Sequence, residues 1–126
     1  MTTALGLTPE ELATYREGAR SRRGQEQRDL AQREKRAWDL ARQSAALLRS
    51  QFGASRVVVF GSLVHEGCFT PWSDVDVAAW GIRPQDTFRA MGMVMDLDTE
   101  LVVNLVDVKT SSDSLLMTIE SDGIDL

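Results

Sequence analysis

Two short apolar runs, separated by a polar loop, most constrain the fold that this chain can adopt. Together with the loop they span Arg56 to Trp80. The first run, Val57 to Phe60, is rich in β-branched residues and stops at Gly61, which is typical of a buried strand ending in a tight turn. Glycine at such a turn lets successive backbone N–H groups approach one point, and the Ser62 hydroxyl adds a donor. This arrangement suits phosphate oxygens, although a Gly-Ser pair after a strand is by itself usually only a turn.

The second run carries two carboxylates, within the sequence Ser73-Asp74-Val75-Asp76-Val77. Because side chains alternate between the faces of a strand, we expect Asp74 and Asp76 on one side and the two valines in the core. Carboxylates held close together repel each other unless a cation lies between them. Mg²⁺ favours one or two carboxylates, with water and substrate phosphates completing its shell, so a metal site is predicted beside the turn. The alternative is that the aspartates only cap a strand in solvent.

A third acid, Asp107, lies in a later apolar run from Leu101 to Val108. This run is too short to span a membrane and suits a strand that is covered on both faces. An unpaired buried carboxylate is strongly unfavourable, so we expect Asp107 to have a partner, and the same metal site is the simplest one. Exposure to solvent at the strand end is the alternative.

The combined motif resembles the DNA polymerase β-type nucleotidyltransferase superfamily: a strand, Gly-Ser, a spacer of eleven residues, Asp-x-Asp, and a later acid between apolar residues. The small size and the ending Thr118 to Ile124 are similar to minimal nucleotidyltransferases of the MNT type. The resemblance covers Phe52 to Leu126 and implies roles for six residues. By resemblance, the residues that bind the nucleotide are Gly61, Ser62 and Ser73. Asp74 and Asp76 would bind two Mg²⁺ ions, and Asp107 would bind one of them and help to activate the attacking hydroxyl.

The resemblance also implies a fold and a reaction. The fold is α/β, with a small mixed β-sheet packed by helices. The reaction is Mg²⁺-dependent transfer of AMP, or another nucleoside monophosphate, from a nucleoside triphosphate such as ATP to a hydroxyl acceptor. MNT-type proteins act as antitoxins that adenylylate a HEPN-type toxin, so a partner protein of this kind is the expected acceptor.

Two alternatives to this function stay open. One is a catalytically degenerate antitoxin that only binds its partner, and the other is an enzyme that modifies a small molecule such as an aminoglycoside. A departure from the family pattern makes the first alternative credible: members commonly have Ala-Arg-Gly soon after Gly-Ser, whereas this chain has Val64-His65-Glu66-Gly67. Retention of all three acids weighs against it. Neutral His65 is a weaker substitute for a cation near the phosphates.

Charge is unevenly distributed along the 126 residues. Up to Arg56 there are 11 basic and 7 acidic residues, and from Val57 onward 3 basic and 12 acidic ones. An acidic second half argues against a nucleic-acid surface there and fits carboxylates that bind metal. With no transmembrane stretch or signal peptide, and with Cys68 as the single cysteine, we expect a cytoplasmic protein.

The N-terminal part is expected to be a long helical extension. Met1 to Gly6 is read as a loose end, and Thr8 to Glu11 forms a capping box at a helix start. Gly24 costs about 1 kcal/mol in a helix interior, so a break near it is predicted. This gives a helical extension, residues 1–25, that docks a partner or a second copy, and a nucleotidyltransferase domain, residues 26–126.

Two further helices are predicted, one after the second strand and one after the third. Gln85 to Leu97 has Phe88, Met91 and Met95 at helical spacing, so we expect these side chains to face the core. Ser111 to Ile119 begins with a Ser-Ser-Asp cap and is expected to bury its apolar residues, Leu115, Leu116 and Ile119.

Overall fold

The three predicted strands all form in the computed structural model, which describes residues 6–126, and the fold is α/β as expected. The expected loose end lies outside the described residues except for Gly6. The elements are α1 (Pro9–Phe52), β1 (Arg56–Phe60), β2 (Val75–Trp80), α2 (Thr87–Met95), β3 (Val103–Asp107), α3 (Asp113–Asp122) and β4 (Ile124–Asp125), with 3₁₀ turns at Gly61–Val64, Pro84–Asp86 and Val108–Thr110.

The sheet is mixed, with the strand order β3-β2-β1-β4. Strand β2 pairs antiparallel with β1 and parallel with β3, so it is hydrogen-bonded along both edges. Its register places Asp76 beside Phe60 of β1 and Asn104 of β3. The short strand β4 adds antiparallel to the other edge of β1.

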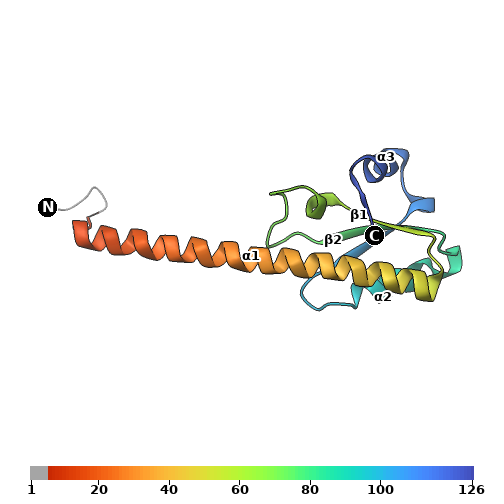
Figure 1. Cartoon of the computed structure of the whole chain (residues 1–126), viewed down its shortest axis with the longest axis horizontal. Coiled ribbons are helices and arrows are strands. Elements are labelled where there is room, and N and C mark those ends of the chain that lie inside the picture. The colour runs from red at the N-terminus through yellow and green to blue at the C-terminus, as the bar shows by residue number, and fades with distance from the viewer. Residues whose placement is uncertain (1–5) are drawn as a thin grey trace. The chain divides into compact units, whose positions relative to one another are not determined.

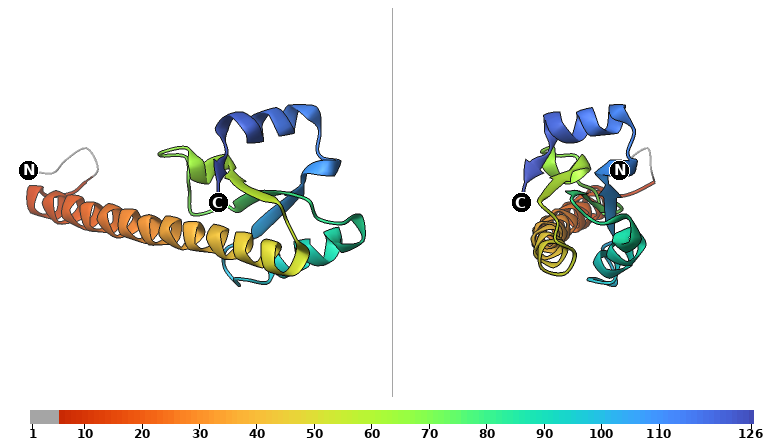
Figure 2. Two further views of the ribbon diagram at one scale, coloured as in Figure 1. Left: turned by 45° about the vertical axis from the view of Figure 1, so that its right-hand side comes forward. Right: turned by 90° about the vertical axis from the view of Figure 1, so that its right-hand side faces the viewer.

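Helices cover both faces of this sheet. Residues 34–52 of α1 lie with α2 along one face, and α3 lies on the other (Figures 1 and 2). On the α3 face, Val58, Phe60, Ala78 and Ile119 form a buried cluster. Residues of opposite parity along β2 point to the other face, and three of them are fully buried there: Val75, Val77 and Ala79. Both faces are therefore apolar core, as the near-continuous apolar runs indicated.

Helix α1 begins as predicted, with the Thr8 hydroxyl accepting from the Glu11 N–H at 3.1 Å and the Glu11 carboxylate accepting from the Thr8 N–H. The predicted break at Gly24 is wrong, because α1 runs without interruption from Pro9 to Phe52. Side-chain hydrogen bonds one turn apart follow the glycine, from Gln25 to Asp29 and from Arg28 to Gln25, and such pairs offset part of its helical cost. The chain divides into two units, one ending at Arg33 and the other comprising Glu34–Leu126. Among residues 6–126, no helix has both the length and the apolar character needed to cross a membrane.

The predicted inner face of α2 is wrong for Phe88 and Met95, whereas Met91 is half-buried. Phe88 is 86% exposed and Met95 is 49% exposed, whereas the buried residues of this helix are Thr87, Ala90 and Val94. The α-helix begins at Thr87, after a 3₁₀ turn. Ala90 follows Thr87 by three residues and Val94 follows Ala90 by four, so these three residues share one face of the helix. Small side chains on this face allow α2 to approach β3 closely.

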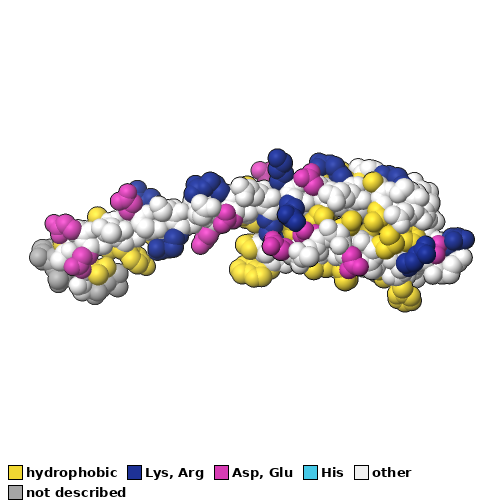
Figure 3. Space-filling view, turned by 90° about the horizontal axis from the view of Figure 1, so that it is seen from below, with side chains coloured by type: hydrophobic (Ala, Val, Ile, Leu, Met, Phe, Trp, Pro, Cys, Tyr) yellow, Lys and Arg dark blue, Asp and Glu magenta, His cyan; other side chains and the backbone are white. Residues whose placement is uncertain are grey.

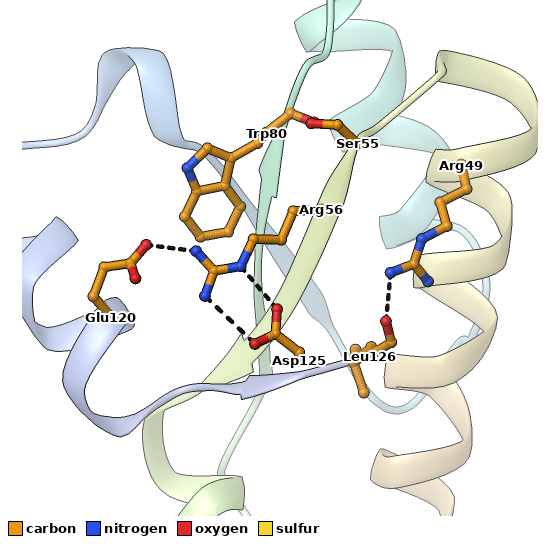
Figure 4. Close-up of polar contacts among 7 residues, drawn as sticks. All are labelled: Arg49, Ser55, Arg56, Trp80, Glu120, Asp125 and Leu126. Atoms are coloured by element: carbon orange, nitrogen blue, oxygen red, sulfur yellow. Dashed lines mark hydrogen bonds and ion pairs between the residues drawn. The ribbon is translucent and has the colours of Figure 1, made fainter.

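The C-terminal segment is held to the sheet by Arg56 at the start of β1 (Figure 4). Its guanidinium lies 4.4 Å from the centre of the Trp80 ring and forms ion pairs with Glu120 at 2.6 Å and Asp125 at 2.8 Å. The hydrogen bonding between Arg56 and Asp125 lowers the pKa of the Asp125 carboxyl. One side chain thus links β1 and β2 to both α3 and β4. The last helix begins near its predicted start, capped by Ser112, but only Ile119 of its three expected core residues is fully buried.

Gly123 connects α3 to β4 at a point where no side chain fits. A Cβ there would overlap Val58 Cγ1 and the Ile119 carbonyl oxygen. We predict that Gly123→Ala lowers the free energy of unfolding by about 1–3 kcal/mol, because overpacking displaces β4 from β1. Urea denaturation measures this effect.

Gly92→Ala is the matched control. Gly92 lies within α2, and a Cβ there would have no heavy atom within 4 Å. That substitution is expected to be stabilising by up to about 1 kcal/mol, because alanine is the better helix former. Equal stability effects in the two variants would show that the close approach at Gly123 has no energetic consequence.

Candidate functional site

The predicted carboxylate pair lies at the start of β2. Asp74 immediately precedes the strand and Asp76 is its second residue. The side chain of Asn104, on the neighbouring strand β3, donates from Nδ2 to Asp74 Oδ2 at 3.3 Å and to Asp76 Oδ1 at 3.4 Å. The two aspartates therefore share one side of the sheet, as the alternation of strand side chains predicted.

The Gly-Ser turn lies directly against this pair. Gly61 has a φ of 79°, in the left-handed region that glycine adopts readily. A Cβ on Gly61 would lie only 2.5 Å from Asp76 Oδ2. Ser62 is half-buried in the following 3₁₀ turn. Gly61 thus satisfies two requirements, a positive φ and room for the carboxylate, and the antiparallel pairing of β1 with β2 brings the two halves of the motif together.

The electrostatics of the pair are unfavourable for two negative charges. Partial burial raises the pKa of Asp76 above its ordinary value, and the charge of Asp74 raises it further, while the hydrogen bond from Asn104 acts in the opposite direction. The net pKa shift is upward. A cation bound between the carboxylates would remove this cost, so the pair is suited to bind one.

Ser73, predicted to bind nucleotide, stabilises the loop that precedes the pair. Its hydroxyl accepts from the Thr70 N–H at 2.9 Å and lies 3.0 Å from the Thr70 hydroxyl, which closes the turn before Asp74. Trp72 in the same turn is 85% exposed. His65, beyond the Gly-Ser turn, lies on the α3 side, with Nε2 3.6 Å from Asp122 Oδ2.

Asp107 does not join the pair, so its predicted place in a three-carboxylate site is wrong. Asp107 lies beside Ala79 in the register, three positions beyond Asn104, and therefore on the opposite face of the sheet from Asp76. It is 2% exposed and does have a partner, as expected: Oδ2 accepts from the Thr87 hydroxyl at 2.8 Å and Oδ1 from the Lys109 N–H at 3.2 Å. Because Thr87 begins α2, the carboxylate anchors the start of that helix.

The residue that sequence reasoning missed is Asn104. It interrupts the same apolar run as Asp107, and only the register of β3 against β2 shows which of the two polar residues faces the pair. The position opposite Asp76 is thus filled by an amide rather than by a third carboxylate. Consistently, no group of three or more His, Cys, Asp or Glu side chains within residues 6–126 is arranged to hold a metal ion.

The raised pKa of Asp76 predicts that its ionised form destabilises the metal-free protein. Ionised Asp76 costs free energy above its folded-state pKa, and this cost disappears as the pH falls below the ordinary value of 3.8. Asp76→Asn should therefore raise the thermal midpoint at pH 7, and its advantage over the wild type should shrink towards pH 4. Glu66→Gln, which removes a charge from an exposed loop, is the control. A lower midpoint for Asp76→Asn at pH 7 would contradict this interpretation.

The contacts of Asp107 predict a structural role for its partner Thr87. Thr87→Val should lower the free energy of unfolding by about 1–3 kcal/mol, because a buried carboxylate loses a donor. The variant should still bind any ligand of the Asp74–Asp76 pair with wild-type affinity. Thr118→Val, on the exposed face of α3, serves as the control in urea denaturation. A loss of ligand affinity at unchanged stability would instead assign Asp107 to the site.

Comparison with known proteins agrees with this architecture. No protein-family model and no curated protein matches the chain. Among solved structures, two crystal structures of mutant forms of the toxin-antitoxin pair MntA-HpeT are similar to it. One has a TM-score of 0.55 and 22% identity, covering 68% of this chain and 69% of that one. The other has a TM-score of 0.55 and 19% identity, covering 68% and 70%. The likeness shows that this chain shares its α/β fold with a chain of these structures, as the expected fold class implied.

Proposed function

We propose that this chain is a nucleotidyltransferase that binds ATP with Mg²⁺ at Asp74 and Asp76 and transfers AMP from the ATP to a hydroxyl of a partner toxin of the HEPN type. The observation that carries the proposal is the contact between the two parts of the motif, in which Asp76 lies against Gly61 at the end of β1. A carboxylate pair and a phosphate-binding turn at one place form a coherent site for a metal-bound triphosphate.

The donor set fits one Mg²⁺ ion brought in with the nucleotide. Two aspartates supply the carboxylate oxygens that Mg²⁺ prefers. Because the charges of the two carboxylates repel each other, binding of a cation between them is favourable. When bound, the ion would neutralise the carboxylates and the phosphates and polarise the reacting phosphoryl group. The second ion expected from the resemblance has no separate carboxylate at this site, because Asp107 lies on the other face of the sheet.

The chain's own contribution is to hold the phosphates in place. The backbone at Gly61 can approach them closely, because no side chain intervenes, and the Ser62 hydroxyl can donate a hydrogen bond. The Ser73 hydroxyl holds the turn that presents Asp74, and its contact with the nucleotide stays a prediction. Transfer forms a phosphoester bond between the acceptor oxygen and the α-phosphorus, breaks the bond to the pyrophosphate, and moves the acceptor proton to solvent or to a base.

A second candidate function is binding of the partner without transfer, and the position of Asn104 favours it. The acid expected to activate the attacking hydroxyl is absent from this face of the sheet within the described chain, and an amide takes its place beside Asp76. The substitution of His65 and Glu66 for the family's usual residues points the same way. In both functions the partner is a toxin, as the likeness to a toxin-antitoxin pair supports. The docking role of the N-terminal helical extension stays a prediction.

The proposed function predicts Mg²⁺-dependent binding of ATP, which calorimetry measures. Asp74→Asn should abolish this binding. Ser62→Ala should weaken it by about 1 kcal/mol, or about fivefold, through the loss of one hydrogen bond to phosphate. Ser50→Ala, on α1, is the control. Wild-type affinity in both site variants would contradict the proposal.

A transfer assay separates the two candidate functions. The protein is incubated with ATP labelled at the α-phosphate, with Mg²⁺, and with the product of a neighbouring reading frame. Label on the partner supports nucleotidyl transfer. Neutralisation of the partner without label, by a protein that still binds ATP, supports the second candidate.

A further inference from the structure

The side chain of Asn104 reaches both carboxylates of the pair from the neighbouring strand β3. Its Nδ2 lies 3.3 Å from Asp74 Oδ2 and 3.4 Å from Asp76 Oδ1, and its Cα is the register partner of Asp76. The residue is half-buried, between the buried Val103 and Leu105 on the strand. It is therefore a third polar residue of the candidate site, held by the sheet rather than by a loop.

An asparagine amide can serve this site in two ways. With Nδ2 towards the carboxylates it is a donor, and in the metal-free protein it supplies the partial positive charge that the pair needs. A half-turn about its last side-chain torsion exchanges the nitrogen with Oδ1, an oxygen of the kind that binds hard cations. The side chain is long enough to reach the pair in the first orientation, so the oxygen reaches the same region in the second.

We propose that Asn104 is a ligand of the divalent cation. In the metal-free site its amide nitrogen donates to Asp74 and Asp76, and in the metal-bound site its amide oxygen turns to the ion. This inference rests on the proposed function, because it takes the cation to be the Mg²⁺ that accompanies ATP. It assigns a third oxygen ligand where β3 has no carboxylate on the face of the pair. Within residues 6–126, no group of three or more His, Cys, Asp or Glu side chains is arranged to hold a metal ion. A neutral third ligand leaves the site with less negative charge than three carboxylates would have.

Two other roles for Asn104 predict different results for removal of its amide. If its N–H groups are permanent donors, the amide competes with the cation, and removing the amide should tighten cation binding. If the side chain only fills space, removing the amide should leave cation binding unchanged. A ligand, by contrast, weakens binding when it is removed and strengthens it when it is replaced by a charged oxygen ligand.

The test uses Mn²⁺ as the probe, because the unbound ion can be counted by electron paramagnetic resonance. The full chain is titrated with MnCl₂ in the presence of a non-hydrolysable ATP analogue at saturating concentration, and the same titration of the analogue alone is subtracted, because the triphosphate itself binds Mn²⁺. The variants are Asn104→Leu, which has similar volume and no polar group, and Asn104→Asp, with Asp74→Asn as the reference for a damaged site. Thermal unfolding without metal establishes that each variant is folded, and Asn104→Val, a strand-favouring residue, replaces the leucine variant if that one does not fold.

We expect Asn104→Leu to bind Mn²⁺ at least about tenfold more weakly than the wild type, and Asn104→Asp to bind it more tightly. Equal or tighter binding by the leucine variant, while Asp74→Asn binds poorly, would overturn the role of Asn104 and leave the proposed function intact. Absence of Mn²⁺ binding by the wild type would overturn both. The readout is cation affinity, so it does not depend on whether the protein transfers AMP.

Discussion

The alternation of side chains along β2 is the constraint on which the rest of the structure depends. This strand is hydrogen-bonded to β1 on one edge and β3 on the other, so its residues can point only to one face of the sheet or to the other. Val75 and Val77 enter the core beneath the helices α1 and α2, and this leaves Asp76 on the face of α3. A slip of one residue would bury the aspartate in apolar core, so the hydrophobic pattern and the site require the same register.

The same rule explains why the two polar residues of β3 have different roles. Asn104 shares the face of Asp76, whereas Asp107, an odd number of residues further on, points to α2. A buried carboxylate needs compensation, and Asp107 receives it from the Thr87 hydroxyl and a backbone N–H. The carboxylates of the candidate site are compensated less completely, by one amide, and partial burial and their mutual repulsion leave the pKa of Asp76 raised. Incomplete compensation of this kind is typical of sites that bind a ligand.

Two glycines allow the close approaches that the fold requires. Gly61 lets the end of β1 lie against the Asp76 carboxylate, and Gly123 lets the chain after α3 pass over Val58 into β4. The second approach matters because β4 is short and depends on Arg56, which holds Asp125 and Glu120 while stacking on Trp80. The site lies beyond the last residue of β1, and β4 pairs with Val58 and Val59 of the same strand. Each is built where glycine leaves room that a side chain would fill.

The sequence by itself determined the strands, the Gly-Ser turn, the Asp74–Asp76 pair and the capped start of α1, because each depends on residues close together along the chain. Strand alternation, turn chemistry and capping act over a few residues, so a local pattern is sufficient to predict them. The tertiary structure decided what depends on partners far away in sequence. The register of β3 against β2 selected Asn104 rather than Asp107, the packing of α2 against β3 selected Ala90 and Val94 rather than Phe88, and α1 remained continuous through Gly24. Each of these outcomes depends on a neighbouring strand, on a packing face or on the summed stability of a whole helix. A local sequence pattern predicts none of these three.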